Sequence, residues 1–197
     1  MANIADFKAQ LVGGGARPNQ FRVELAFPSY VTAGIIAGTR AQFLCKAAQL
    51  PAATIEDIPV QYRGRAVHFA GERTFAPWTV SIINDTTFNI RNAFEQWSNG
   101  VQNLTTTNGR TNPRDYQVDL NVHQLDRNGG IIKSYKFVDA YPTNIGAIAL
   151  SFDTTNAIEE FEVEFTYNFW SSNTATASGV GVNVSIDTPI GSLPIRI

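Results

Sequence analysis

Residues 63–85 read RGRAVHFAGERTFAPWTVSIIND and hold the clearest structural signal in this 197-residue chain. The run predicts two strands joined by a tight turn at residues 70–73. In the second strand apolar and polar side chains alternate, as they do in a strand with one buried face. The inward set is Trp78, Val80 and Ile82.

One helix follows directly from this stretch. Asn84-Asp85-Thr86 supplies side chains that cap a helix N-terminus. Residues 85–98 then place apolar side chains on a single helical stripe. The stripe consists of Ile90, Ala93, Phe94 and Trp97. This is the only helix that the sequence predicts, and Asn99-Gly100 is expected to end it.

The other periodic segments predict strands. Alternating or β-rich runs bounded by Pro, Gly, Asn and Asp occur at residues 21–27, 43–50, 58–62, 66–69, 73–83, 116–123, 131–141, 145–152 and 158–170. About nine strands and one helix indicate a mainly β chain, a two-sheet β-sandwich or barrel-like sheet with one flanking helix.

The chain divides into a main domain and a tail. Residues 1–170 fit one domain, with a flexible lead-in at 1–18 and an extended loop at 28–41. Residues 171–197 change in character: they are rich in Ser, Thr and Gly and nearly free of charge. Apolar side chains alternate in this extension at Val180, Val182, Val184 and Ile186. It is therefore expected to form an added strand or arm, which pairs with a sheet edge.

Composition excludes several classes of function. Charged residues make up 16% of the chain, the formal net charge is −2, and 22 side chains are Phe, Tyr or Trp (13 + 6 + 3). A low charge fits a β domain that hides surface in an assembly, and no basic field attracts nucleic acid. The single cysteine, Cys45, excludes an internal disulfide and is expected to be a buried hydrophobe. No signal peptide, membrane span, metal site or cofactor site is expected.

The 28–41 loop contains Val31, Ile35 and Ile36 among small residues. Such a loop would be adhesive on a monomer. It serves either as a contact arm for a neighbouring subunit or as a segment folded back on its own core, and the sequence leaves both readings open.

Three carboxylates share one face of the 158–170 strand. Glu160, Glu162 and Glu164 alternate with Phe161, Val163 and Phe165. Side by side on a strand these carboxylates repel one another, so their face needs water or cations. Glycoside hydrolysis by such a pair is a poor interpretation, because an open strand lacks the asymmetry that separates acid from base. His68 and His123 lack partners at metal-ligand spacing.

Arginines flank the two turns of the opening stretch. Arg63, Arg65 and Arg73 alternate with aromatic side chains, which is one pattern of single-strand nucleic-acid binding. Because the chain is weakly acidic, we favour ion pairs with carboxylates of an adjacent subunit, such as Glu56, Asp57 or Glu72.

These pieces, in their order and spacing, resemble the tail tube proteins of contractile-tailed bacteriophages. The resemblance covers roughly residues 16–170. It rests on the segments 16–21, 45–47, 50–51, 58–60, 70–75, 78–80, 84–85, 94–97, 141–146 and 158–163.

The resemblance implies a non-enzymatic structural subunit. It would form hexameric rings that stack into a hollow tube inside the contractile sheath, through which DNA reaches the host. The implied partners are other copies, the tail sheath protein, baseplate and tail terminator proteins, and DNA passing through the lumen. No stable membrane binding is implied. The implied location is the virion tail, assembled in the host cytoplasm.

The resemblance also gives the side chains above a role. Glu160, Glu162 and Glu164 become candidates for a lumen face that repels DNA phosphates. The alternative for them is an outer face, solvated or paired with a neighbour. Two alternative functions remain: the tube of a protein-delivering contractile injection system, and a β-sandwich carbohydrate-binding module.

Overall fold

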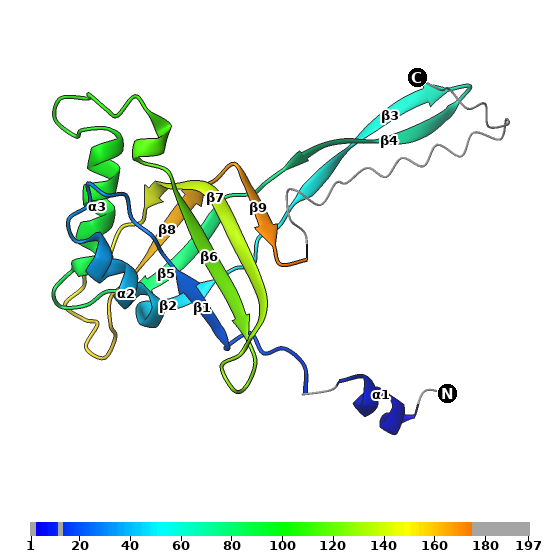
Figure 1. The fold of residues 1–197 in the computed structure, drawn as a ribbon, viewed down its shortest axis with the longest axis horizontal. Coiled ribbons are helices and arrows are strands. Elements are labelled where there is room, and N and C mark those ends of the chain that lie inside the picture. Colours follow the sequence, from blue (N-terminus) through cyan, green and yellow to red (C-terminus); the bar gives the residue numbers. More distant parts are fainter. Residues whose placement is uncertain (1–2, 12–13, 175–197) are drawn as a thin grey trace, which may run out of the picture.

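The computed structural model describes residues 3–11 and 14–174, and its core is a strongly bent sheet closed by two helices (Figure 1). The strands follow the order β1–β6–β7–β8–β5–β2, with β9 on the other side of β7 from β6, and β3 pairs only with β4. The elements are α1 (Ile4–Gln10), β1 (Phe21–Glu24), α2 (Gly34–Leu44), β2 (Cys45–Ala48), β3 (Thr54–Tyr62), β4 (Arg65–Thr74), β5 (Trp78–Ile83), α3 (Asn89–Val101), the 3-10 turn η2 (Pro113–Asp115), β6 (Val118–Leu125), β7 (Ile131–Ile145), β8 (Glu160–Thr166) and β9 (Phe169–Ser172).

The long strand β7 divides the sheet into two layers. Its residues 131–140 pair with β6, and residues 135–138 pair with β9 on the other edge. Its residues 141–145 pair instead with β8. The first layer is therefore β1–β6–β7–β9 and the second is β7–β8–β5–β2. This confirms the predicted two-sheet β fold.

Aromatic side chains fill the space between the layers and the helices. Trp78 of β5 stacks on Phe137 of β7 with ring centroids 4.2 Å apart. Phe94 of α3 lies 5.8 Å from Phe165 of β8. The indole N–H groups of Trp78 and Trp97 donate to backbone carbonyls, at 2.7 and 2.8 Å, so burial leaves neither unpaired. The predicted stripe of α3 and the inward face of β5 are confirmed as core.

The predicted loop at 28–41 is wrong over most of its length, because α2 occupies residues 34–44. The helix was missed since its side chains are apolar all round and show no helical period. It packs closely on β1: a Cβ at Gly38 would lie 2.7 Å from the carbonyl oxygen of Leu25. The predicted strand at 43–50 shrinks accordingly to β2, residues 45–48.

Three other predicted elements differ. The lead-in holds the short helix α1, which Asn3 and Asp6 close with a capping box. The helix predicted at 85–98 begins at Asn89, four residues late, because Asp85 caps it from a preceding turn. The turn predicted at 70–73 is continuous strand, β4. Gly71 lies there at a bulge, where a Cβ would meet the Glu56 carbonyl oxygen at 2.9 Å.

The end of the chain also departs from the prediction. Pro142 does not stop β7, because it lies at an irregular register where the strand changes partner. No strand forms at 145–152 beyond Ile145, and the predicted 158–170 strand is split into β8 and β9. The alternating residues 180–186 lie outside the described residues.

The aromatic core predicts a large cost for truncation of α3. Phe94→Ala should lower the free energy of unfolding by about 3–5 kcal/mol, since it leaves a cavity among four aromatic rings. Chemical denaturation followed by tryptophan fluorescence measures this. Phe152→Ala is the matched control, because Phe152 is fully exposed and its loss should cost less than about 0.5 kcal/mol. Equal effects of the two substitutions would contradict the packing described.

Candidate assembly surfaces

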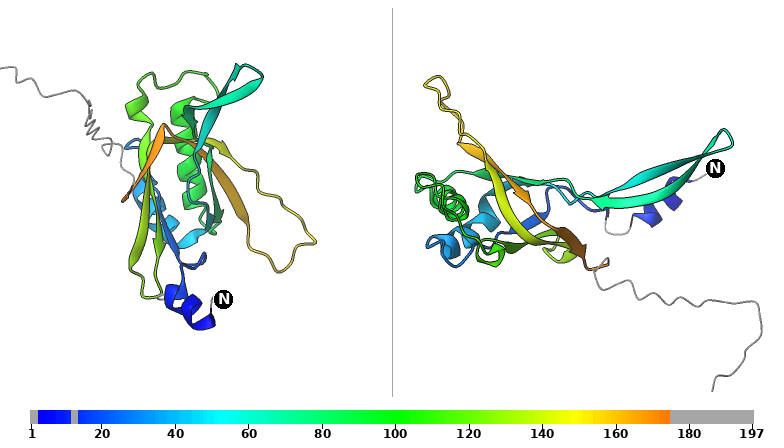
Figure 2. Two further views of the ribbon diagram at one scale, coloured as in Figure 1. Left: turned by 90° about the vertical axis from the view of Figure 1, so that its right-hand side faces the viewer. Right: turned by 90° about the horizontal axis from the view of Figure 1, so that it is seen from above.

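The β3–β4 hairpin projects from the body and packs on no other described element (Figures 1 and 2). All its residues except Gly71 are exposed. The chain reverses at Arg63-Gly64, where both φ angles are positive, 49° and 81°, as in a two-residue type I′ turn. The hairpin is therefore held together by its own ladder alone.

The two faces of this hairpin differ in chemistry. Pairs in register share a face, so Ile58 with Phe69 and Val60 with Val67 form one face that also includes Tyr62. These five apolar side chains are 44–61% exposed. The opposite face carries Pro59, Gln61 and the ion pair of His68 with Asp57, at 2.6 Å. We call the first set the hairpin apolar face.

The arginines singled out in the sequence lie on this hairpin. Arg63 and Arg65 are at its tip, and Arg63 lies 5.3 Å from the Tyr62 ring centroid. Arg73 is near its base, opposite Ile55. Within residues 3–11 and 14–174 none of the three forms an ion pair in its own subunit, whereas Asp57 pairs with His68. The arginines are thus free to pair outside the subunit.

Helix α2 carries a second unpartnered apolar surface. Ile35 and Ile36 point outward, with Ile35 88% exposed, and Phe43 is exposed two turns along. Val31 behaves differently: it is buried in the core just before the helix. Its expected role as a contact for a neighbouring subunit is wrong, because its side chain has no free surface. The 28–41 segment therefore combines both readings, with Val31 inward and the two isoleucines outward.

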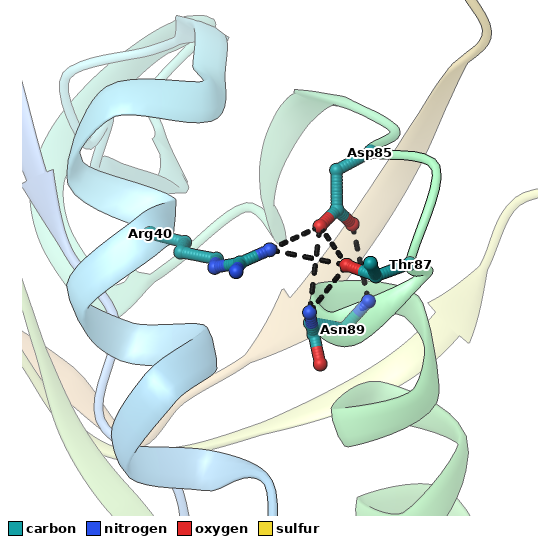
Figure 3. A network of polar contacts seen from close by, with 4 residues as sticks. All are labelled: Arg40, Asp85, Thr87 and Asn89. Atoms are coloured by element: carbon teal, nitrogen blue, oxygen red, sulfur yellow. Dashed lines mark hydrogen bonds and ion pairs between the residues drawn. The ribbon is translucent and has the colours of Figure 1, made fainter.

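A polar network fixes α2 against the start of α3 (Figure 3). Arg40 of α2 donates to Asp85 Oδ2 at 2.5 Å and to Thr87 Oγ1 at 3.1 Å. Thr87 donates to the same carboxylate, and the backbone N–H of Asn89 donates to Asp85 Oδ1 at 3.1 Å. Burial raises the pKa of the Asp85 carboxyl, but the Thr87 and Asn89 hydrogen bonds and the Arg40 charge outweigh it and leave the pKa below its ordinary value.

The outward face of the second layer is acidic. Glu160, Glu162 and Glu164 lie along β8 with their side chains away from the core. Lys46 of β2 binds Glu160 at 2.6 Å, and Ser81 of β5 donates to Glu162 at 3.3 Å. Glu160 alone of these three pairs with a cation among the described contacts, so two negative charges remain uncompensated.

The outward face of the first layer is balanced. Arg22 pairs with Glu24 at 3.2 Å, and Lys136 pairs with Asp119 at 2.6 Å. His123 lies beside Glu24 at 3.4 Å and Ser134 at 2.8 Å, which extends this polar row. The two outward faces of the sheet therefore differ in net charge.

A further surface was missed by the sequence analysis. Residues 146–159 leave the body as an arm between β7 and β8, in a different direction from the hairpin (Figure 2). Leu150, Phe152 and Ile158 are exposed on it. The segment was interpreted as a strand because of its apolar residues, although the polar run 153–156 signalled a loop.

No catalytic or metal centre emerges from the described residues. No group of three His, Cys, Asp or Glu side chains lies close enough there to hold a metal ion. Burial raises the pKa of the half-buried Cys45 thiol to about 12, which keeps it protonated and unreactive. Within the same residues, no helix is long and apolar enough to cross a membrane.

Comparison with known sequences agrees with this geometry. The sequence model of the family described as "Phage tail tube protein" matches residues 16–173. The chain is 34% identical over 161 residues to tail tube protein gp19 of Enterobacteria phage T4, covering 80% of this chain and 92% of that one. It is 24% identical over 172 residues to the tail tube protein of Serratia phage KSP90, covering 85% of this chain and 95% of that one.

Solved structures with this fold belong to contractile injection machines. A chain in the cryo-EM structure of the anti-feeding prophage tube-terminating cap has a TM-score of 0.59 at 16% identity, over 80% of this chain and 90% of that one. A chain of the PVC sheath–tube complex in its extended state has a TM-score of 0.52 at 12% identity, over 83% and 95%. At these identities the likeness establishes the fold.

The Arg40–Asp85 network predicts a pH-dependent stability. Asp85→Asn should lower the free energy of unfolding by about 1–2 kcal/mol at pH 7, because the carboxylate accepts several hydrogen bonds and Arg40 is partly solvated. A depressed folded pKa stabilises the protein above the unfolded value of about 3.9. The difference should therefore shrink below about pH 4, and urea denaturation at a series of pH values measures it.

Glu95→Gln is the control for this pH series. Glu95 pairs with Arg91 on the exposed side of α3 at 2.8 Å, so its loss should cost less than about 0.5 kcal/mol. An Asp85→Asn effect that stays constant down to pH 3 would show that the carboxylate charge does not contribute.

Proposed function

Because the chain belongs to the phage tail tube protein family, we propose that its copies form hexameric rings that stack into the hollow tube of a contractile tail. The family role is structural, and the protein is a component of the virion tail. We propose further that the tube assembles in the host cytoplasm and carries no enzymatic activity. In this proposal the sheath surrounds the tube, the baseplate and terminator bind its two ends, and DNA passes through its bore.

The hairpin apolar face is the observation that carries the proposal. A two-stranded hairpin is marginal in water when nothing covers it. This hairpin nevertheless exposes five large apolar side chains on one face, well away from the core. A neighbouring copy is the partner that supplies the same cover to every subunit. Since the hairpin contacts a different patch from itself, the contact is heterologous and generates rings or stacks.

Charge supports contact with another copy. The unpaired Arg63 and Arg65 occupy the hairpin tip, while the 146–159 arm carries Asp153 and Glu159. Ile35 and Ile36 on α2 and the exposed side chains of the arm provide further apolar contact area. Edges and arms that project in different directions suit a subunit with several neighbours.

We assign the acidic face of β8 to the bore. Glu162 and Glu164 keep uncompensated charge, whereas the balanced face of the first layer would neither attract nor repel phosphates strongly. A negative lining keeps DNA from adhering, because it removes the counterion release that drives binding to cations. An acidic bore favours DNA over protein as cargo, so a protein-delivering injection system is the second candidate.

A carbohydrate-binding module is a weaker alternative. Such modules present aromatic side chains on an open strand face, whereas Trp78 and Trp97 are buried here. Trp170 donates its indole N–H to the Ala52 carbonyl oxygen at 3.2 Å and packs edge-on against Tyr135. The described residues thus offer no tryptophan platform for a sugar.

Assembly should depend on which face of the hairpin is altered. Val60→Glu places a charge on the hairpin apolar face and should abolish rings and tubes in negative-stain electron microscopy of concentrated protein, with baseplate added where the free protein stays monomeric. Gln61→Glu is the matched control, one residue along on the opposite face. Both variants should melt as the wild type does, because the hairpin lies outside the core.

The result has clear opposites. Tubes formed equally by both variants would remove the hairpin apolar face from the assembly. A wild-type protein that stays monomeric with a baseplate present, yet binds a glycan, would contradict the tube function itself.

The bore assignment predicts a gain of DNA binding. Tubes of the Glu162→Lys/Glu164→Lys variant should retain a short labelled DNA about tenfold or more better than wild-type tubes at 50 mM salt, and lose it at 200 mM. Pull-down of labelled DNA with sedimented tubes measures this. Asp119→Lys is the comparison on the other layer. If Asp119→Lys alone increased retention, the first layer would line the bore instead.

A further inference from the structure

The hairpin has two outer edges, and they are not equivalent. Pro59 lies in β3 and lacks a backbone N–H, so it interrupts that edge as a donor. Strand β4 contains no proline. From Arg65 to Ala70 its register with β3 is regular, and the bulge begins only at Gly71. Strand β4 therefore offers about six residues of uninterrupted edge.

The end of the chain reaches this place. Trp170 of β9 donates to the carbonyl oxygen of Ala52, two residues before β3 begins, so β9 lies beside the hairpin base. Residues 175–197 continue the chain beyond the described residues. Six residues of extended chain, from Thr174 to Val180, span up to about 20 Å. That is enough to bring the following segment alongside the hairpin.

The sequence of residues 180–186 matches the hairpin in period and length. Val180, Val182, Val184 and Ile186 fall on one face of an extended segment, and Gly181, Asn183 and Ser185 on the other. Seven residues cover the six-residue edge of β4. A hairpin with one apolar and one polar face takes such a strand in only one orientation, since a slip of one residue would turn the valines to the polar side.

The direction of the chain also fits β4. Strand β4 runs from the tip of the hairpin to its base, so a segment that starts at the base and runs outward is antiparallel to it. Antiparallel pairing needs no long crossover connection. The same segment on the outer edge of β3 would be parallel and would face Pro59. Asp187, which follows the segment, would then reach the tip near Arg63 and Arg65.

We infer that residues 180–186 add as a third strand to the outer edge of β4 in the same subunit, with Val180, Val182, Val184 and Ile186 extending the hairpin apolar face. Three strands with a shared apolar face can be stable where two are marginal. The added strand covers an edge that would otherwise recruit foreign strands. This inference concerns the free subunit and does not depend on how rings assemble.

Disulfide trapping tests this pairing in dilute monomer. In a Cys45→Ala background, Val67→Cys is combined with Val182→Cys or Val184→Cys, and mild oxidation is followed on non-reducing gels. At least one pair should close within the subunit, because cross-strand neighbours lie within disulfide range. Val60→Cys is the matched control: Val60 faces the same side but is one strand further, at about 10 Å.

Hydrogen exchange gives an independent readout. Removal of residues 176–197 should speed exchange of β4 amides between Arg65 and Ala70 by about tenfold or more, while exchange in β5 and β8 stays unchanged. Two results would overturn the inference: the same β4 exchange in both proteins, or disulfides to Val60 in preference to Val67. Disulfide-linked dimers in dilute protein would also overturn it, because the strand would then come from another copy. Tubes formed without any such disulfide would leave the tube function standing while this inference failed.

Discussion

The packing of α3 on the bent sheet supports the rest of the structure. Phe94 and Trp97 fill the space that the two layers leave open, and Trp78 joins the layers by stacking on Phe137. Once these rings are buried, β7 can change partner from β6 to β8, and α2 can close against β1. The core is therefore complete within one subunit.

What the core does not use is equally informative. The hairpin, the outward side of α2 and the 146–159 arm all expose large apolar side chains, although the core has its full set. An isolated soluble domain gains nothing from such surfaces and risks aggregation. In a subunit with several neighbours they are interfaces that await burial. The energy of assembly and the energy of folding thus come from separate parts of the chain.

Charge follows the same division. The first layer neutralises its own outward charges by ion pairs, whereas β8 leaves two carboxylates without cations. The arginines at the hairpin tip likewise lack partners in the subunit. Uncompensated charge costs little while it is solvated, and it becomes specific once a neighbour or a polyanion approaches.

Much of the fold could be predicted from the sequence alone. The alternation in β5, β6 and β8, the stripe of α3 and the turn at 126–130 follow from local pattern, because each element has one buried and one solvated face. The same patterns brought together the segments that indicate the tail tube family. The set Glu160, Glu162 and Glu164 was found in this way, as were the hairpin arginines.

Other features depended on contacts between distant residues. Helix α2 has no amphipathic period, and only its closeness to Leu25 and its link to Asp85 show why it forms. The continuity of β4 through Gly71 depends on the Glu56 carbonyl across the strand pair, and the passage of β7 through Pro142 depends on a change of partner. The inward position of Val31 and the outward position of Ile35 are likewise decided by what packs against them. Local periodicity determines which face of an element is buried, but tertiary packing determines where an element of uniform polarity lies and which partner it has.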